Sequence, residues 1–326
     1  LHTSRDAFAV VRQLRSLIRL VEPDVVHAWC GEAIWLTLLA TQPLPLLTEL
    51  PEFRLLATEL SQHPEKNFLR GAIEDIISSR IETLIVPHPL IADDLAAEGI
   101  IAQNVVQIPN GIRIGDFDPA NQTALTDRGA RSRPELRRSV RETMGVSGDA
   151  YLAIAVADLV PRTRLKDLIW ATDLLTCIRN DFHFGIIGVG SQLRRLKRFA
   201  GQTKARPNVH FLGLPASPET YIAAADFYWH SHLQSPQSAK LLSAMAMGVP
   251  SISVLGPETE DIVRHQETGF ATNFGARDEF ARWTKYLIEQ TDPGAQLARQ
   301  GQNHVLEIFH FDAMFSEYAS LYGLSN

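Results

Sequence analysis

The residues best suited to chemistry form the polar loop 234–238, which lies between an expected strand at 226–230 and an expected helix at 238–247. Serine oxygens in this loop can cap the helix, and Pro236 suits its first turn. Free N–H groups and the dipole at such a helix end attract an anion. Gly248 stands where a left-handed residue ends a helix, and a strand resumes at 250–255. The segment predicts a nucleotide-phosphate pocket in a parallel α/β domain.

The elements that position this loop alternate between strand and helix, which predicts parallel sheets. The region 52–80 is charged and amphipathic, so we expect surface helices there. Residues 303–323 are expected to form a long apolar helix pair. The other expected strands are 24–29, 44–47, 84–87, 105–109, a run starting at Tyr151, 183–189 and 208–212, and the other expected helices are 6–21, 32–41, 89–98, 134–144, 165–179, 191–200 and 217–225.

Length and composition narrow the class of protein. A chain of 326 residues favours two domains. The net charge of −6 argues against nucleic acid as the principal partner. No apolar run approaches the ~18 residues that a spanning helix needs, and the polar opening segment is unlike a signal peptide. Cys30 and Cys177 lack disulfide or metal-site spacing, so we expect packed thiols in a reducing, cytoplasmic compartment.

Short motifs along the chain carry a family resemblance. Residues 244–250 read AMAMGVP and residues 23–27 read PDVVH. Further segments are IPNGI at 108–112, VADLVP at 156–161, GIIGVG at 185–190, VHFLG at 209–213, AD at 225–226 and ETGF at 267–270. Their types and order resemble the retaining group-1 glycosyltransferases of the GT-B fold. As a dinucleotide fingerprint, Gly188 to Gly190 is weak, because Leu193 occupies the third glycine position.

The resemblance implies an α/β fold of two Rossmann-like, doubly wound lobes. We expect an acceptor-side lobe at 1–120, a linker at 121–150, a donor-side lobe at 151–302 and C-terminal helices at 303–326 that pack back on the first lobe. The first lobe is expected to be truncated, since the family's first strand and its glycine-rich loop are missing.

The resemblance also implies a donor site whose charged residues have changed. The family's two donor-holding glutamates fall at Ser235 and Ser243, and its diphosphate-holding Arg and Lys fall at Asp158 and Thr163. Arg162 and Arg164 are the candidate substitute cations, because arginine binds phosphate through forked donors. The expected donor-binding residues are Arg162, Arg164, Gly190, Ser235, Pro236, Gln237, Ser238 and Ser243.

Catalytic candidates are fewer. The family's H-x-H motif has His27 at its first position here, but Trp29 replaces its second histidine. His27 is therefore a catalytic candidate that also suits a structural role at the strand end. Glu260 or Asp261 precedes Ile262 where the family places a glutamate, and Glu260 is the candidate taken from this pair. Neither the histidines nor the cysteines show metal-site spacing, so no metal and no cofactor are expected.

The function implied is transfer of a sugar from a nucleotide-sugar donor to an unknown acceptor. The alternative is a catalytically inactive GT-B descendant that serves as a binding or scaffold module, because most site residues have changed together. A nucleotide-sugar epimerase fits less well, since its cluster of carboxylates and histidines is not visible. No nucleic-acid partner or transmembrane segment is expected, and peripheral membrane contact is left open.

Overall fold

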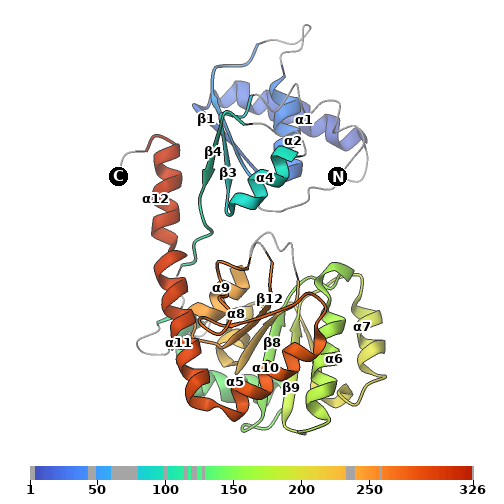
Figure 1. Cartoon of the computed structure of the whole chain (residues 1–326). Helices are drawn as coiled ribbons and strands as arrows, with labels where there is room; N and C mark the ends of the chain where they lie inside the picture. The colour runs from blue at the N-terminus through green and yellow to red at the C-terminus, as the bar shows by residue number, and fades with distance from the viewer. Residues whose placement is uncertain are drawn as a thin grey trace. The chain divides into compact units, whose positions relative to one another are not determined.

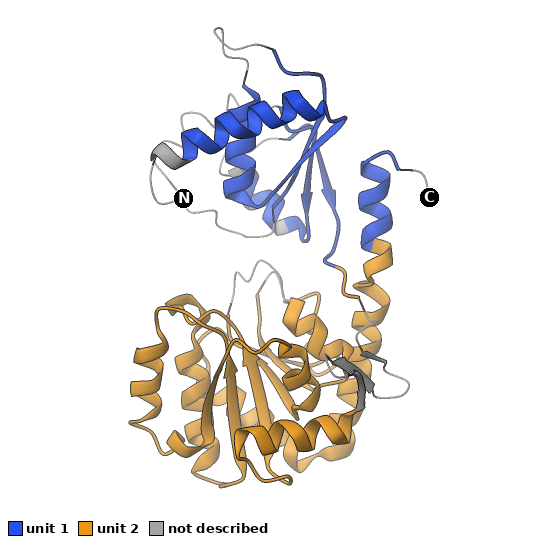
Figure 2. Cartoon of the chain, turned by 180° about the vertical axis from the view of Figure 1, so that it is seen from behind, with its two compact units in different colours: residues 1–110, 314–326 blue, residues 111–313 orange. Residues whose placement is uncertain are grey.

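The chain folds into two compact units in the computed structural model (Figures 1 and 2). Unit 1 comprises residues 1–110 and 314–326, and unit 2 comprises residues 111–313. The structure describes residues 4–42, 49–59, 80–97, 102–113, 117–118, 123–126, 129–232, 239–256 and 259–324.

Unit 1 is built on a parallel sheet with strand order β1-β2-β3-β4. Apolar side chains of the strands, such as Ala57 and Leu84, pack with those of flanking helices, such as Leu38 and Ile91. The elements are α1 (Ser4–Val21), β1 (Val25–Trp29), α2 (Gly31–Thr41), β2 (Arg54–Thr58), β3 (Thr83–Val86), α4 (Pro89–Ala97) and β4 (Asn104–Gln107). Alternating strand and helix segments with short apolar runs produce this arrangement, as expected for a parallel sheet.

The strand β2 corrects one expectation. Its residues lie in the region 52–80, where we expected surface helices, yet Leu56 and Ala57 are fully buried between β1 and β3. The apolar run at residues 55–57 is too short to show helical or strand periodicity, so its charged surroundings misled the prediction. The strand expected at 44–47 lies outside the described residues.

The end of the chain packs within unit 1. The helix α12 (Phe311–Leu321) places Tyr318 against Ile85 and Ile108. Nη1 of Arg54 donates to the carbonyl oxygen of Leu321 at 2.8 Å. These contacts tie the last residues to β2 and β3.

Unit 2 contains a six-stranded parallel sheet with the order β10-β9-β8-β11-β12-β13. Taken in chain order this is 3-2-1-4-5-6, so the direction of winding reverses between β8 and β11. The strands are β8 (Tyr151–Val156), β9 (Phe182–Ile187), β10 (Val209–Gly213), β11 (Phe227–His230), β12 (Ser251–Val254) and β13 (Phe270–Thr272).

Helices cover both faces of this sheet (Figure 1). One apolar cluster joins the sheet to α6 (Leu165–Thr176), α7 (Leu193–Ala200) and α10 (Arg277–Glu289). A second cluster joins the other face to α5 (Arg133–Met144), α8 (Pro218–Ala224), α9 (Ala239–Ala246) and α11 (Thr291–Ile308). The helix α9 ends at a left-handed Gly248, with φ of 64°, as its sequence predicts.

The segment expected as a linker contains structure of its own. The strands β5 (Phe117–Asp118), β6 (Thr123–Thr126) and β7 (Gly129–Ser132) form a small antiparallel sheet. The helix α5 follows, starts with a capping box of Ser132 and Glu135, and packs on α8 within unit 2.

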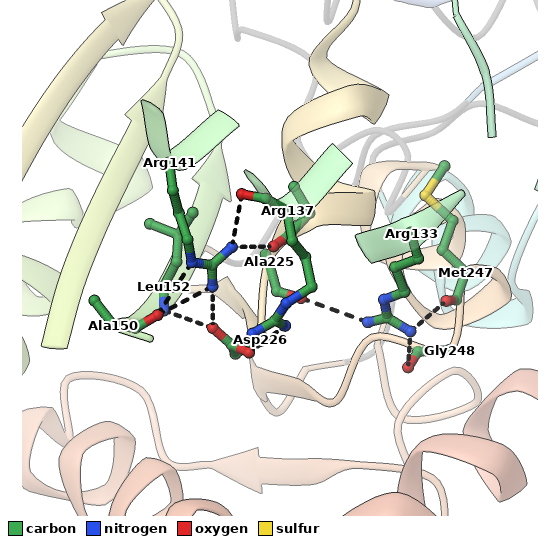
Figure 3. A network of polar contacts seen from close by, with 10 residues as sticks. Arg133, Arg137, Arg141, Ala150, Leu152, Ala225, Asp226, Met247 and Gly248 are labelled. Carbon is green, nitrogen blue, oxygen red and sulfur yellow. Dashed lines mark hydrogen bonds and ion pairs between the residues drawn. The ribbon is translucent and has the colours of Figure 1, made fainter. Parts of the chain in front are cut away.

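A buried polar network fastens α5 to the strand starts (Figure 3). Arg141 is 1% exposed and donates to a carboxylate oxygen of Asp226 at 2.6 Å and to the Ala224 carbonyl at 2.9 Å. Asp226 also accepts from Arg137 and from the N–H of Leu152. One carboxylate thereby joins α5, β8 and β11 at the edge where the strands begin, the amino edge.

Candidate functional site

The opposite edge, where the strands of unit 2 end, collects the described site candidates and is called the carboxyl edge. It comprises residues 157–164 after β8, 188–190 after β9, 231–232 after β11, and 255–256 and 259–260 after β12. In open α/β sheets, ligands bind outside the strand ends at the point where the winding reverses. Here that point lies between the loops that follow β8 and β11.

A buried threonine fixes the loop after β8. The hydroxyl of Thr163, which is 3% exposed, bonds to the carbonyl oxygens of Asp158 and Val160, each at 2.8 Å. Its own carbonyl accepts from the Ser231 hydroxyl at 2.6 Å. Thr163 is therefore an internal tie between two loops, and its side chain has no capacity left to hold a phosphate as a lysine would.

Two glycines let the loops after β8 and β9 run side by side. Gly188 and Gly190 have φ values of 147° and 157°. A Cβ on Gly188 would lie 1.9 Å from the Ala157 carbonyl oxygen, and one on Gly190 would lie 2.6 Å from that of Leu159. The structure thus assigns Gly190 a close backbone approach, while its contact with a donor stays a prediction.

The two candidate arginines, Arg162 and Arg164, have different surroundings. Arg162 is exposed and lies close enough to His232 to lower the pKa of that histidine. Arg164 has a left-handed backbone conformation. Its Nε lies 2.5 Å from one carboxylate oxygen of Asp167, and Nε of Arg277 lies 2.8 Å from the other. Its guanidinium also sits 4.5 Å above the ring of Phe274. Arg164 is thus committed to an ion pair.

A pocket of about 250 Å³ lies beside this ion pair, between the start of α6 and α7. Arg164, Asp167, Arg195 and Phe199 contribute to its walls. Val160 and Pro161 of the loop after β8 also line it, so the pocket lies beside the carboxyl edge and Arg164 faces it together with Asp167.

Two histidines that were not among the expected site residues lie here, His230 as the last residue of β11 and His232 two residues after it. His230 is 3% exposed, and its ring centroid lies 4.2 Å from that of His232. No described residue makes a hydrogen bond of ordinary geometry with either ring nitrogen of His230 or with Nδ1 of His232. Burial is the main reason that the pKa of His230 falls well below its usual value and that of His232 falls to about 4. The signal in the sequence was their spacing, which puts both on one side of an extended segment.

The remaining donor candidates are Ser243 and the loop residues 235–238. The Ser243 hydroxyl donates to the carbonyl oxygen of Ala239, four residues earlier, at 2.8 Å. This back-bond is the alternative that its place on an apolar helix suggested. Ser235, Pro236, Gln237 and Ser238 lie outside the described residues.

Of the catalytic candidates, Glu260 lies at the carboxyl edge of unit 2 and His27 lies in unit 1. Glu260 is exposed, and its N–H donates to the Gly256 carbonyl at 2.9 Å. Nδ1 of His27 is 2.6 Å from the Tyr322 hydroxyl, and its Nε2 is 2.7 Å from Oγ1 of Thr58. Burial lowers the pKa of His27 to about 4. Through these two hydrogen bonds, the neutral ring of His27 connects β1 to Thr58 of β2 and to Tyr322 near the end of the chain.

Within the part of the chain that the structure describes, no three His, Cys, Asp or Glu side chains are grouped to hold a metal ion. None of the described helices has the length and apolar character needed to cross a membrane. The cysteines correct an expectation, because Cys30 and Cys177 are exposed free thiols rather than packed ones.

Solved structures of other proteins share this architecture. HepE of Anabaena, in complex with UDP and glucose, matches with a TM-score of 0.80 at 19% identity, over 97% of this chain and 80% of that one. A glycosyltransferase of Rickettsia africae matches with a TM-score of 0.76 at 16% identity, over 98% and 82%. TarM of S. aureus matches with a TM-score of 0.71 at 15% identity, over 96% and 58%. The two parallel sheets with flanking helices are those of the GT-B glycosyltransferase fold.

The sequence places the chain within this class. Residues 151–290 match the family Glycosyl transferases group 1, and residues 2–111 match the Glycosyl transferase 4-like domain. The chain belongs to the group-1 glycosyltransferases.

Curated relatives match over part of their length. The lipopolysaccharide core biosynthesis glycosyltransferase LpsE of Rhizobium meliloti is 22% identical over 181 residues, which are 56% of this chain and 52% of LpsE. The N-acetyl-alpha-D-glucosaminyl L-malate synthase of Bacillus anthracis is 20% identical over 184 residues, 56% of this chain and 48% of that protein. The chain spans about half the length of the curated relatives it matches.

Proposed function

We propose that this chain transfers a glycosyl group from a UDP-sugar to an acceptor that its residues do not specify. Membership of the group-1 family supports the reaction class. UDP is supported by HepE, whose structures contain UDP with glucose and UDP-glucose. The exposed free thiols fit a reducing compartment, which supports a cytoplasmic location.

The observation that carries the proposal is the reversal of winding between β8 and β11. It puts residues 157–164 and 231–232 on either side of the position where α/β sheets bind nucleotides. Thr163 and Ser231 fix the two loops to each other. The site is therefore built before a ligand arrives, which reduces the cost of binding.

In the transfer, the bond between the sugar carbon and the β-phosphate oxygen breaks and UDP leaves with the negative charge. An acceptor hydroxyl oxygen bonds to the same carbon, and its proton passes to the leaving phosphate. Protein groups that meet this charge lower the barrier. We assign that role to Arg162 and to the amino end of α9, and we leave Arg164 out because Asp167 holds it. Glu260 stays the acid candidate, whereas His27 is assigned to structure because both its nitrogens are bonded.

Calorimetry with UDP, GDP and ADP tests the proposal, followed by a measurement of UDP release from UDP-glucose. We expect UDP to bind at millimolar concentration or below, equivalent to at least about 4 kcal/mol, and UDP-glucose to be slowly hydrolysed. Absence of binding by all three nucleotides would contradict the proposal. Binding without any release of UDP would favour the inactive descendant.

A further inference from the structure

The histidine pair at the end of β11 leaves polar atoms buried without described partners. Both ring nitrogens of His230 and Nδ1 of His232 are in this position. Burial and the charge of His232 lower the pKa of His230. The backbone of His232 raises this pKa, but it is the smallest of the three effects. Buried polar groups are otherwise almost always hydrogen-bonded, because leaving one unpaired costs about 1–3 kcal/mol. Such a pair marks a place where a ligand can supply the missing partners.

The pair lies where the proposed diphosphate would bind. Ser231, between the two histidines, is hydrogen-bonded to the loop after β8. The charged groups that act on His232 are Asp158 and Arg162 of that loop, and His230 is its neighbour on β11. Asp158 is exposed and occupies the position that the family resemblance gives to a cation. A second source of positive charge is therefore needed here.

Building on the proposed function, we infer that His232 takes up a proton when the nucleotide sugar binds and, with Arg162, provides the positive charge that faces the diphosphate. One proton moves from the solvent to a ring nitrogen of His232, and no covalent bond to the ligand forms. His230 packs behind the imidazolium.

The energetic argument concerns which charges surround His232 in the two states. Without ligand, burial and the positive charge of Arg162 keep the ring neutral, against the smaller opposing effect of Asp158. An incoming diphosphate adds negative charge, which favours the imidazolium and offers its N–H groups acceptors. Because the ring of His230 is only 4.2 Å away, a second proton on the pair would be repelled. Binding is therefore coupled to at most about one proton.

A metal ion is the other ligand that two histidines suggest. The described residues supply no third His, Cys, Asp or Glu to complete such a group. The adjacent positive charge of Arg162 also disfavours a cation. An anion fits both observations better.

The test is calorimetry of UDP-glucose binding to the whole chain, in EDTA and in buffers of different ionisation enthalpy. UDP-glucose is chosen because its diphosphate is a diester, whereas the terminal phosphate of UDP itself titrates near pH 6. We expect net proton uptake at pH 6 and an affinity that rises by up to about tenfold for each pH unit between 7.5 and 5.5. His232→Gln should abolish both effects and weaken binding.

His210→Gln is the matched control. The pKa of His210 is also lowered to about 4 by burial, but this residue lies on β10 against His183, with ring nitrogens 3.0 Å apart. The control should keep the proton uptake. Uptake that survives in His232→Gln, or is lost in His210→Gln, would overturn the inference.

A measurement on the unaltered chain guards against a variant that does not fold. Histidine ring resonances followed by NMR from pH 4 to 8 should show one residue whose pKa rises by two units or more when UDP-glucose is present. If UDP-glucose binds and no histidine pKa changes, the inference fails while the proposed function stands. If UDP-glucose and UDP do not bind at all, both fail.

Discussion

At the scale of single residues, the carboxyl edge of unit 2 is shaped by side chains that replace expected charges. Thr163 stands where the family resemblance places a lysine, and its hydroxyl and carbonyl are both used to hold loops together. Asp158 stands where it places an arginine. In our proposal, the positive charge that faces the diphosphate comes instead from Arg162 and from His232.

Restoring a cation at position 158 should strengthen donor binding. Asp158→Arg replaces a repulsive carboxylate by forked donors, and a charge-assisted hydrogen bond contributes about 1.5–3 kcal/mol. We expect UDP-glucose affinity to rise about ten- to a hundredfold by calorimetry. Asp149→Arg makes the same charge change in the turn before β8, at the amino edge, and should leave the affinity within about twofold. An equal gain in both variants would show that overall charge alone is responsible.

The sequence indicated the loop that holds Arg162 and Arg164 better than it indicated the surroundings of each side chain. Arg162 and Arg164 look equivalent as a basic loop, but Asp167 lies three residues after Arg164 and captures it. That i,i+3 pair was readable in advance. The contact between the rings of His230 and His232 could not be read from the sequence, because it depends on how deeply β11 is buried.

At the scale of elements, α5 is joined to the sheet by the buried pair of Arg141 and Asp226. The strand starts of β8 and β11 depend on the same carboxylate, which accepts from the Leu152 N–H at 2.8 Å. Arg133 adds longer contacts to the carbonyls of Ala225 and Gly248 (Figure 3). The network holds the amino edge, opposite the proposed site.

Removing this carboxylate should destabilise unit 2 strongly. Asp226→Ala leaves the Arg141 guanidinium buried without its counter-charge, which costs about 3–5 kcal/mol. Urea unfolding followed by circular dichroism measures the change. The control Asp181→Ala breaks an ion pair with Arg179 in which the aspartate side chain is 49% exposed, and should cost less than about 1 kcal/mol. A loss below 1 kcal/mol for Asp226→Ala would show that the network contributes little.

Most elements were predictable because β–α alternation and helix ends leave clear marks. Gly248 marked the end of α9 in the sequence, and the expected helix at 134–144 corresponds to α5. The strand β2 was not predictable from its charged surroundings, since its neighbours β1 and β3 decide that Leu56 is buried. The small sheet β5-β6-β7 likewise had no apolar alternation to reveal it.

At the scale of the whole molecule, buried histidines in both units should make the fold sensitive to acid. His27 in unit 1 and His210 and His232 in unit 2 each have a pKa lowered to about 4, mainly by burial. The unfolded chain, with histidine near 6.5, therefore binds more protons than the folded chain between pH 4 and 6.5. Their contribution to stability is complete above pH 6.5 and is lost as the pH falls to 4.

The thermal unfolding midpoint should follow that window. We expect it to fall steadily from pH 6.5 to 4.5 and to change little from pH 6.5 to 8. His210→Gln should flatten the acid side, because it removes one of the groups that must be protonated. A midpoint that is constant or higher at pH 4.5 would contradict the assignment of these rings as neutral.

The most direct test of the central claim is hydrogen exchange of backbone amides, measured by mass spectrometry with and without saturating UDP-glucose. The claim is that the carboxyl edge of unit 2 binds the donor. Exchange should slow in peptides covering residues 157–164, 188–190 and 229–232, and should be unchanged at the amino edge around Asp149 and Asp226. Slowing confined to the amino edge, or no slowing at the carboxyl edge once binding is saturated, would contradict the account.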